Sequence, residues 1–198
     1  KGIVFNSPTG FDLIDFALYA QKAAANIWSD VQTFSAIPVL SGGGIKFTAT
    51  QIPSADVNVL DDYEEGTWTP AINFATPGNL SVAYSNQTGS YVKIGKVVIY
   101  SYLIATTTFT RPTASGLLYI GGLPFGTASN FNGSGSSAMS GYTRAGYTTL
   151  GHETGTAGQT RLYVQIGGSG VGLSDISAVD TPTGGTIRLY GSGTYISV

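Results

Sequence analysis

The 198-residue chain has no cysteine, one histidine and a small share of charged residues. The lack of cysteine excludes a disulfide framework, a thiolate metal site and a cysteine nucleophile. The single histidine, His152, excludes any site that needs two imidazole ligands. Charged residues make up 10% of the chain, against about 25% in a typical soluble domain. With a net charge of −2, the scattered basic residues provide no positive field for nucleic acid.

Long apolar runs are also missing, so no segment is predicted to insert into a membrane. The chain begins Lys1-Gly2-Ile3, without methionine or a signal segment, and we therefore expect a piece of a longer protein. Glycine is abundant, with 28 residues, beside 12 tyrosines and 9 phenylalanines. This aromatic content argues against disorder.

The first 35 residues carry a pattern typical of a helix. Ser7-Pro8 is a favourable helix start, and apolar residues follow with heptad-like spacing from Phe11 to Trp28. An isolated helix of this length is marginal in water, so its apolar seam needs a partner surface. We predict a helical neck over residues 1–35 that associates as a coiled coil. A helix packed on its own domain is the alternative.

Residues 36–65 alternate between apolar and polar positions only in short bursts, interrupted by Pro38, Pro53 and three consecutive glycines. Strands this short do not build a sheet within one chain. Three copies wound around one axis would cover the apolar side chains, because glycine lets backbones approach closely. We predict an extended, intertwined β shaft and, with it, a homotrimer. Edge strands and loops around a monomeric core are the alternative.

Residues 66–198 contain alternating or apolar runs separated by turn signals, which is typical of an antiparallel β-sandwich or jelly-roll head. The nearly continuous apolar run from Val97 to Ile104 predicts a central strand that is covered on both faces. Residues 126–160 are rich in glycine, serine and threonine and are expected to form long surface loops. The turn signals lie at 76–79, 86–89 and 182–185. The predicted fold class is therefore mainly β, with a short helical neck.

Catalytic patterns are missing from the sequence. No serine lies in a Gly-x-Ser-x-Gly context, and we interpret His152 as a surface histidine without catalytic work. The acidic run 61–65 contains enough carboxyl groups for glycoside hydrolysis, but adjacent acids usually form a solvated face or a junction. We predict no catalytic residue, no metal and no cofactor.

The loop-rich stretch offers the side chains that bind sugars. Aromatic rings stack on the apolar C–H faces of a sugar, and polar groups bind its hydroxyls. Because binding residues concentrate on loops held by a rigid scaffold, we predict a glycan site here. Packing of these residues beneath the loops is the alternative. The candidate residues are Phe131, Asn132, Tyr142, Arg144, Tyr147, His152, Glu153 and Arg161.

Three motifs resemble a known family. They are LDDYEEGTWTP at 60–70, GSYVKIGKVV at 89–98 and IGGLPF at 120–125, preceded by the shaft-like IPVLSGGGIKF at 37–47. Together they resemble the carboxy-terminal regions of tailed-bacteriophage tail fibre proteins and related prophage proteins. The resemblance covers roughly residues 37–125, and beyond them only the ending GSGTY at 191–195 is similar.

The resemblance implies a homotrimer with an amino-terminal virion attachment region, a slender shaft and a distal receptor-binding head. The expected partners are two identical chains, a bacterial surface polysaccharide (capsule or lipopolysaccharide), and other tail or baseplate proteins bound through a region upstream of this chain. The expected location is the virion tail fibre, assembled in the cytoplasm of the bacterial host. A polysaccharide depolymerase tailspike and a purely structural trimerisation or capping module are the alternatives.

Overall fold

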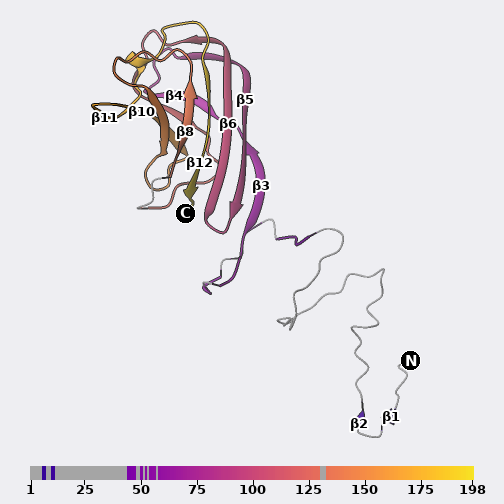
Figure 1. Ribbon diagram of the computed structural model, residues 1–198. Helices are drawn as coiled ribbons and strands as arrows, with labels where there is room; N and C mark the ends of the chain where they lie inside the picture. The colour runs from indigo at the N-terminus through magenta and orange to yellow at the C-terminus, as the bar shows by residue number, and fades with distance from the viewer. Residues whose placement is uncertain are drawn as a thin grey trace. The chain divides into compact units, whose positions relative to one another are not determined.

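Figure 1 shows the computed structural model of the chain, in which two compact units span Lys1–Ile45 and Lys46–Val198. In the first unit, β1 (Asn6–Ser7) pairs antiparallel with β2 (Gly10–Phe11). The structure describes residues 6–7, 10–11, 44–47, 50, 52, 54–56, 58–129 and 133–198.

The predicted helix start at Ser7-Pro8 is wrong, because the backbone at Ser7, Gly10 and Phe11 is paired as strand. A Ser-Pro-Thr-Gly sequence is as typical of a turn as of a helix start, since proline favours both and glycine favours the turn. The rest of the predicted neck lies outside the described residues, as do residues 36–43 of the predicted shaft.

Ten strands of the second unit form one antiparallel sheet, which confirms the expectation of a mainly β, antiparallel fold. The described residues contain no α-helix and one short 3-10 turn, η2 (Ala178–Asp180). The strands are β3 (Tyr63–Trp68), β4 (Ala71–Thr76), β5 (Ser81–Ile94), β6 (Val97–Thr110), β7 (Ser115–Gly121), β8 (Ser134–Met139), β9 (Thr149–Thr154), β10 (Arg161–Gly168), β11 (Val171–Asp175) and β12 (Arg188–Ile196).

The sheet curls on itself. Its strand order is β3-β5-β6-β12-β8-β9-β10-β7-β4, with β11 paired to β10. The two edge strands β3 and β4 are consecutive in sequence and only Thr69 and Pro70 join them, so the two edges meet at this corner. Figure 1 shows the long strands β5 and β6 on one side of this curled sheet and β10 and β11 on the other. The predicted boundary between shaft and head, after residue 65, falls inside β3.

The core lies inside the curl. From Val97 to Thr106 the side chains of β6 alternate, with Val98, Tyr100, Tyr102 and Ile104 buried. Opposite them are the buried aliphatic residues of β7 and β10, which are Leu118, Ile120, Leu162, Val164 and Ile166. The prediction that 97–104 is covered on both faces is therefore wrong for a single chain, because every second residue of β6 points out of the curl.

Glycine makes room for aromatic rings in this core. In the strand ladder Tyr100 pairs with Gly193, Gly193 with Gly135, and Gly135 with His152. Because the two glycines carry no side chain, the Tyr100 and His152 rings reach each other across two strands, with their centroids 5.7 Å apart. The prediction that 133–137 is part of a surface loop is wrong for this reason: Ser134–Met139 is an inner strand whose glycine serves packing.

The turn predicted at 86–89 is also wrong. These residues lie within β5, and Gly89 pairs with Trp68 of β3. A Cβ at Gly89 would lie 2.3 Å from Nε1 of Trp68, so the glycine is required by the indole above it. The turn predicted at 76–79 is confirmed: Gly78 has φ +51° and the amide of Leu80 donates to the carbonyl of Pro77 at 3.0 Å.

Replacing Gly135 with alanine should destabilise the protein by about 1–3 kcal/mol, because the new Cβ has no room. It would lie 2.2 Å from the carbonyl oxygen of Ser192 and 2.4 Å from Nε2 of His152. Thermal unfolding followed by circular dichroism measures the effect. Gly172→Ala is the matched control, since no atom lies within 4 Å of a Cβ at Gly172. Equal losses in the two variants would contradict this account of the core.

Candidate functional site

The acidic run 61–65 is tied into the sheet where the chain enters β3. Asp62 and Lys93 form a buried ion pair, with 8% and 6% of their side chains exposed. The hydroxyl of Tyr91 donates to Glu64, and burial together with this hydrogen bond raises the pKa of Tyr91 to about 12. These partners join β3 and the segment before it to β5, as a junction requires.

Three of the predicted glycan residues, Tyr142, Arg144 and Tyr147, come together beside η2, and we name them the η2 cluster. The guanidinium of Arg144 lies 4.6 Å from the centroid of the Tyr147 ring, and the hydroxyl of Tyr142 donates to the carbonyl of Tyr147 at 3.4 Å. Arg144 also donates to Ser174 Oγ at 3.0 Å and lies 3.6 Å from the Asp180 carboxylate. Nη1 of Arg144 is therefore engaged within this chain. Two further predicted residues, Phe131 and Asn132, lie outside the described part of the chain.

The interpretation of His152 as a surface residue is wrong: its side chain belongs to the core and is only 1% exposed. Its Nε2 lies 2.6 Å from the hydroxyl of Tyr100, and its Nδ1 lies 2.6 Å from Ser137 Oγ. Ser137 Oγ in turn lies 2.8 Å from the hydroxyl of Tyr102. We name Tyr100, His152, Ser137 and Tyr102 the buried polar chain.

The buried polar chain suits an uncharged imidazole. A neutral histidine has one N–H and one lone pair, which match one hydroxyl on each side in either direction. Burial lowers the pKa of His152 to about 4 and raises the pKa of Tyr102 to about 12. The Ser137–His152 distance fits a nucleophile and base. However, both ring nitrogens are engaged inside the core, and the arrangement serves packing.

The remaining two predicted residues, Arg161 and Glu153, lie on the outer face of the sheet. Arg161 covers the Tyr119 ring, with its guanidinium carbon 4.8 Å from the ring centroid, and donates to the Tyr163 hydroxyl at 3.4 Å. Glu153 pairs with Tyr163 in the ladder between β9 and β10. The structure therefore divides the predicted set between the η2 cluster, the core and this outer face.

Sequence reasoning missed Tyr119 and Tyr163 as surface residues. Their rings lie 6.2 Å apart between centroids, on neighbouring strands. The signal is the alternation around them, since Leu118, Ile120 and Leu162 are fully buried and place the tyrosines between them on the opposite face.

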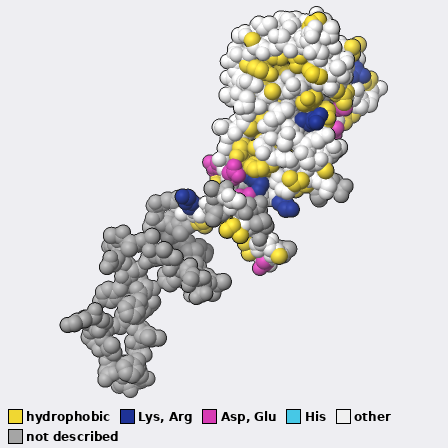
Figure 2. Space-filling view, turned by 180° about the vertical axis from the view of Figure 1, so that it is seen from behind, with side chains coloured by type: hydrophobic (Ala, Val, Ile, Leu, Met, Phe, Trp, Pro, Cys, Tyr) yellow, Lys and Arg dark blue, Asp and Glu magenta, His cyan; other side chains and the backbone are white. Residues whose placement is uncertain are grey.

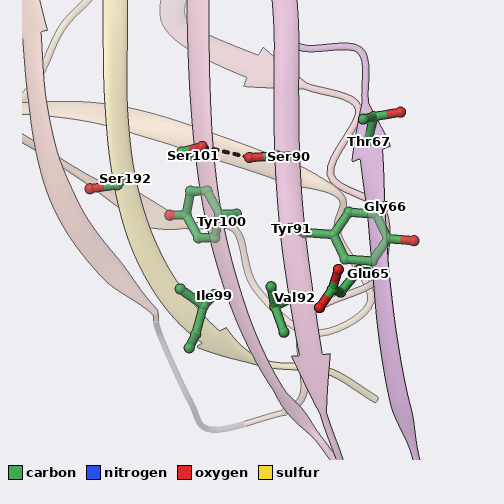
Figure 3. Close-up of a pocket in the computed structure, with 10 residues that line it drawn as sticks. All are labelled: Glu65, Gly66, Thr67, Ser90, Tyr91, Val92, Ile99, Tyr100, Ser101 and Ser192. Atoms are coloured by element: carbon green, nitrogen blue, oxygen red, sulfur yellow. Dashed lines mark hydrogen bonds between the residues drawn. The ribbon is translucent and has the colours of Figure 1, made fainter. Parts of the chain in front are cut away.

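A shallow groove of about 590 Å³ runs along the outer face of β3, β5 and β6 (Figure 3). Its rim carries Ser90 and Ser101, whose hydroxyls lie 2.8 Å apart. A second groove of about 350 Å³ lies over β8 and β12 and shares Ser192 with the first. The first groove is lined by Glu65, Gly66, Thr67, Ser90, Tyr91, Val92, Ile99, Tyr100, Ser101 and Ser192.

The outer face that carries these grooves exposes apolar side chains. Ile99, Val97 and Ile94 are 47%, 40% and 43% exposed on β5 and β6, and Tyr190 of β12 is 47% exposed. Figure 2, seen from behind the view of Figure 1, shows hydrophobic side chains among uncharged polar surface and few charged side chains on the side of the head in view. We name Ile94, Val97 and Ile99 the aliphatic face.

Among the described residues, no group of three or more histidine and acidic side chains is arranged to hold a metal ion. A search of the same residues for a helix long and apolar enough to cross a bilayer finds none.

The sequence matches no protein-family model and no curated protein. Among solved structures, the chain is similar to the Dettilon tailspike protein (gp208), with 19% identity and a TM-score of 0.46. The match covers 66% of this chain and 23% of the tailspike chain. A similarity of this size defines neither the ligand nor the activity of this chain.

Proposed function

We propose that this chain is the distal part of a bacteriophage tail fibre that adsorbs the virion to its host by binding a surface polysaccharide. The sequence motifs at 60–70, 89–98 and 120–125 support this class of protein. Three identical chains form the head, and other tail or baseplate proteins hold it on the virion through an upstream region. The protein is assembled in the bacterial cytoplasm.

The observation that carries the proposal is the aliphatic face. Ile94, Val97 and Ile99 leave much of their side chains in water on β5 and β6, where each buried methylene would contribute about 0.8 kcal/mol. Exposed apolar patches of this kind mark interaction surfaces. A second copy of the chain covers this face, and threefold repetition of one weak sugar site multiplies the affinity for a cell surface.

The head acts as a binding protein in this proposal, without turnover of the polysaccharide. Several of its described carboxylates are engaged structurally: Asp62 with Lys93, Glu65 with Tyr63, and Asp175 with Gln165 at 3.2 Å. Glycoside hydrolysis needs two carboxyl groups that face one bond across a gap of about 5–9.5 Å. New reducing ends released from the bound polysaccharide would favour the depolymerase alternative instead.

The proposal is tested by adsorption of the fluorescently labelled protein to a panel of bacterial strains. Binding should survive protease treatment of the cells and be lost after periodate, which cleaves the vicinal diols of sugars. Binding that is lost with protease and kept with periodate would identify a protein receptor. The absence of binding to every strain, by a protein shown to be trimeric, would contradict an adsorption role.

Replacing Ile99 with glutamate should convert the trimer to monomers of 20.5 kDa. The carboxylate would be buried without a partner at the centre of the subunit contact, which costs several kcal/mol at each copy. Light scattering coupled to size exclusion measures the mass. Leu173→Glu is the matched control, because Leu173 is an exposed aliphatic residue of β11, which pairs with β10 and lies away from β5 and β6. A wild-type protein that is itself a stable monomer would overturn the trimer.

A further inference from the structure

The outer face of the sheet changes character on its second half, formed by β4, β7, β10 and β9. In the strand ladders Asn73 pairs with Tyr119, Tyr119 with Tyr163, and Tyr163 with Glu153. Directly paired residues share one face of a sheet, so these four form a continuous row. The row crosses four strands and is roughly 14 Å long at the usual strand spacing. We name it, together with Arg161, the tyrosine platform.

Arg161 is held over the platform with most of its donors uncommitted. Its guanidinium stacks on Tyr119 at 4.8 Å, and the described residues offer it one hydrogen bond, to the Tyr163 hydroxyl at 3.4 Å. A guanidinium has five N–H donors in a fixed plane. Arg144, the other arginine that stacks on a tyrosine near the predicted loop site, is instead tied to Ser174 and Asp180.

Small residues keep the platform open beside the rings. Arg161 pairs with Gly121, and Gly121 pairs with Ala71, so small residues stand on one side of Tyr119. On its other side along β7 stands Leu117, which is 37% exposed. A Cβ at Gly121 would lie 3.7 Å from the Tyr119 ring and 3.5 Å from Nδ2 of Asn73, in ordinary contact. Packing therefore does not require glycine here. Its effect is a clear approach to the ring and to the amide.

We propose that the tyrosine platform binds an uncharged hexopyranose unit of the surface polysaccharide, an inference that rests on the proposed function. The tyrosine rings accept the C–H face of the sugar. Arg161 donates to sugar hydroxyls, while Glu153 accepts from them. One cation and one anion leave the platform with no net charge, which favours a neutral sugar over an acidic one. The aliphatic face lies on the other half of the sheet, on β5 and β6.

The test compares two arginines that both stack on tyrosine. Arg161→Gln should weaken binding at least about tenfold at each site, and Arg144→Gln should leave it unchanged. The probes are the strain that adsorbs the wild-type protein and a printed array of neutral and uronic-acid-containing bacterial oligosaccharides. Tyr163→Ala is a second platform variant. Thermal unfolding of each variant shows that the loss arises in a folded protein.

Each outcome decides one point. Tenfold weaker binding to neutral sugars by both platform variants supports the proposal. Loss of binding in Arg144→Gln with full binding in Arg161→Gln would move the site to the η2 cluster and overturn the platform, while adsorption itself stands. Wild-type binding to uronic-acid sugars alone would overturn the neutral ligand. A wild-type protein that binds no strain and no sugar on the array would remove the proposed function together with the platform.

Discussion

Replacing Lys93 with methionine should lower the free energy of unfolding by about 3–5 kcal/mol, because the Asp62 carboxylate would remain buried without its cation. Both side chains are less than 10% exposed. Methionine keeps most of the length and apolar character of the lysine stem, so the loss reports the ion pair more than the packing. Equilibrium unfolding in urea at pH 7 measures the change.

A matched control and a double variant isolate the buried pair. Lys96→Met removes an exposed lysine from the adjacent turn and should change stability by less than about 0.5 kcal/mol. Adding Asp62→Leu to Lys93→Met removes the stranded charge and should recover part of the loss, since a buried pair often costs little when both partners become apolar. A double variant that is less stable than Lys93→Met would show that the two residues are not coupled in this way.

Acid should weaken the protein through His152. The pKa of this imidazole is about 4 in the folded core and about 6.5 in an unfolded chain, so the unfolded state binds the proton first. The stabilising contribution is complete above pH 6.5, falls as the pH drops, and is lost by about pH 4. The total is about 3 kcal/mol, of which about 2 kcal/mol is lost by pH 5. Urea unfolding at a series of pH values measures it.

The variant His152→Gln separates this titration from that of the carboxylates. Glutamine retains a donor and an acceptor for Tyr100 and Ser137 but does not titrate. Its stability should be lower than that of the wild type at pH 7.5, and the difference between the two proteins should shrink towards pH 5. Two parallel stability curves over this range would show that the buried polar chain accepts a charged imidazole.

Several strands of the head were predictable, whereas β8, β9 and the packing of the sheet were not. Alternation and turn chemistry place the strands, and the Thr76–Asn79 turn follows from proline and glycine at the right offsets. The run 97–104, however, is apolar or aromatic at every position except Ser101, so its pattern does not show which face is covered within one chain. Only the burial of Val98 against the exposure of Ile99 distinguishes them.

The larger errors in the predicted secondary structure arose at glycines, because glycine occurs both in turns and in strands where an aromatic ring needs space. The glycines of 133–137 favour a loop prediction, but Gly135 lies in a strand and pairs with His152, whose ring occupies the space beside it. Only the strand register distinguishes the two roles. A glycine that pairs with an aromatic residue makes space for the ring, whereas a glycine at positive φ belongs to a turn. Tyr119 and Tyr163 were not predicted as a pair for the same reason: the sequence does not give the strand register, and the two residues become neighbours only when β7 and β10 pair.

The path of the chain into the head has a mechanical consequence. β3 is an edge strand that pairs along its whole length with β5, from Tyr63 opposite Ile94 to Trp68 opposite Gly89. A pull transmitted from the amino-terminal side therefore acts along the strand axis and loads all of these rungs at once. The Lys93–Asp62 ion pair shares that load at the point of entry. Under such a pull, all the β3–β5 residue pairs must separate together. A strand that is peeled from one end would instead lose its pairs one at a time, at a lower force.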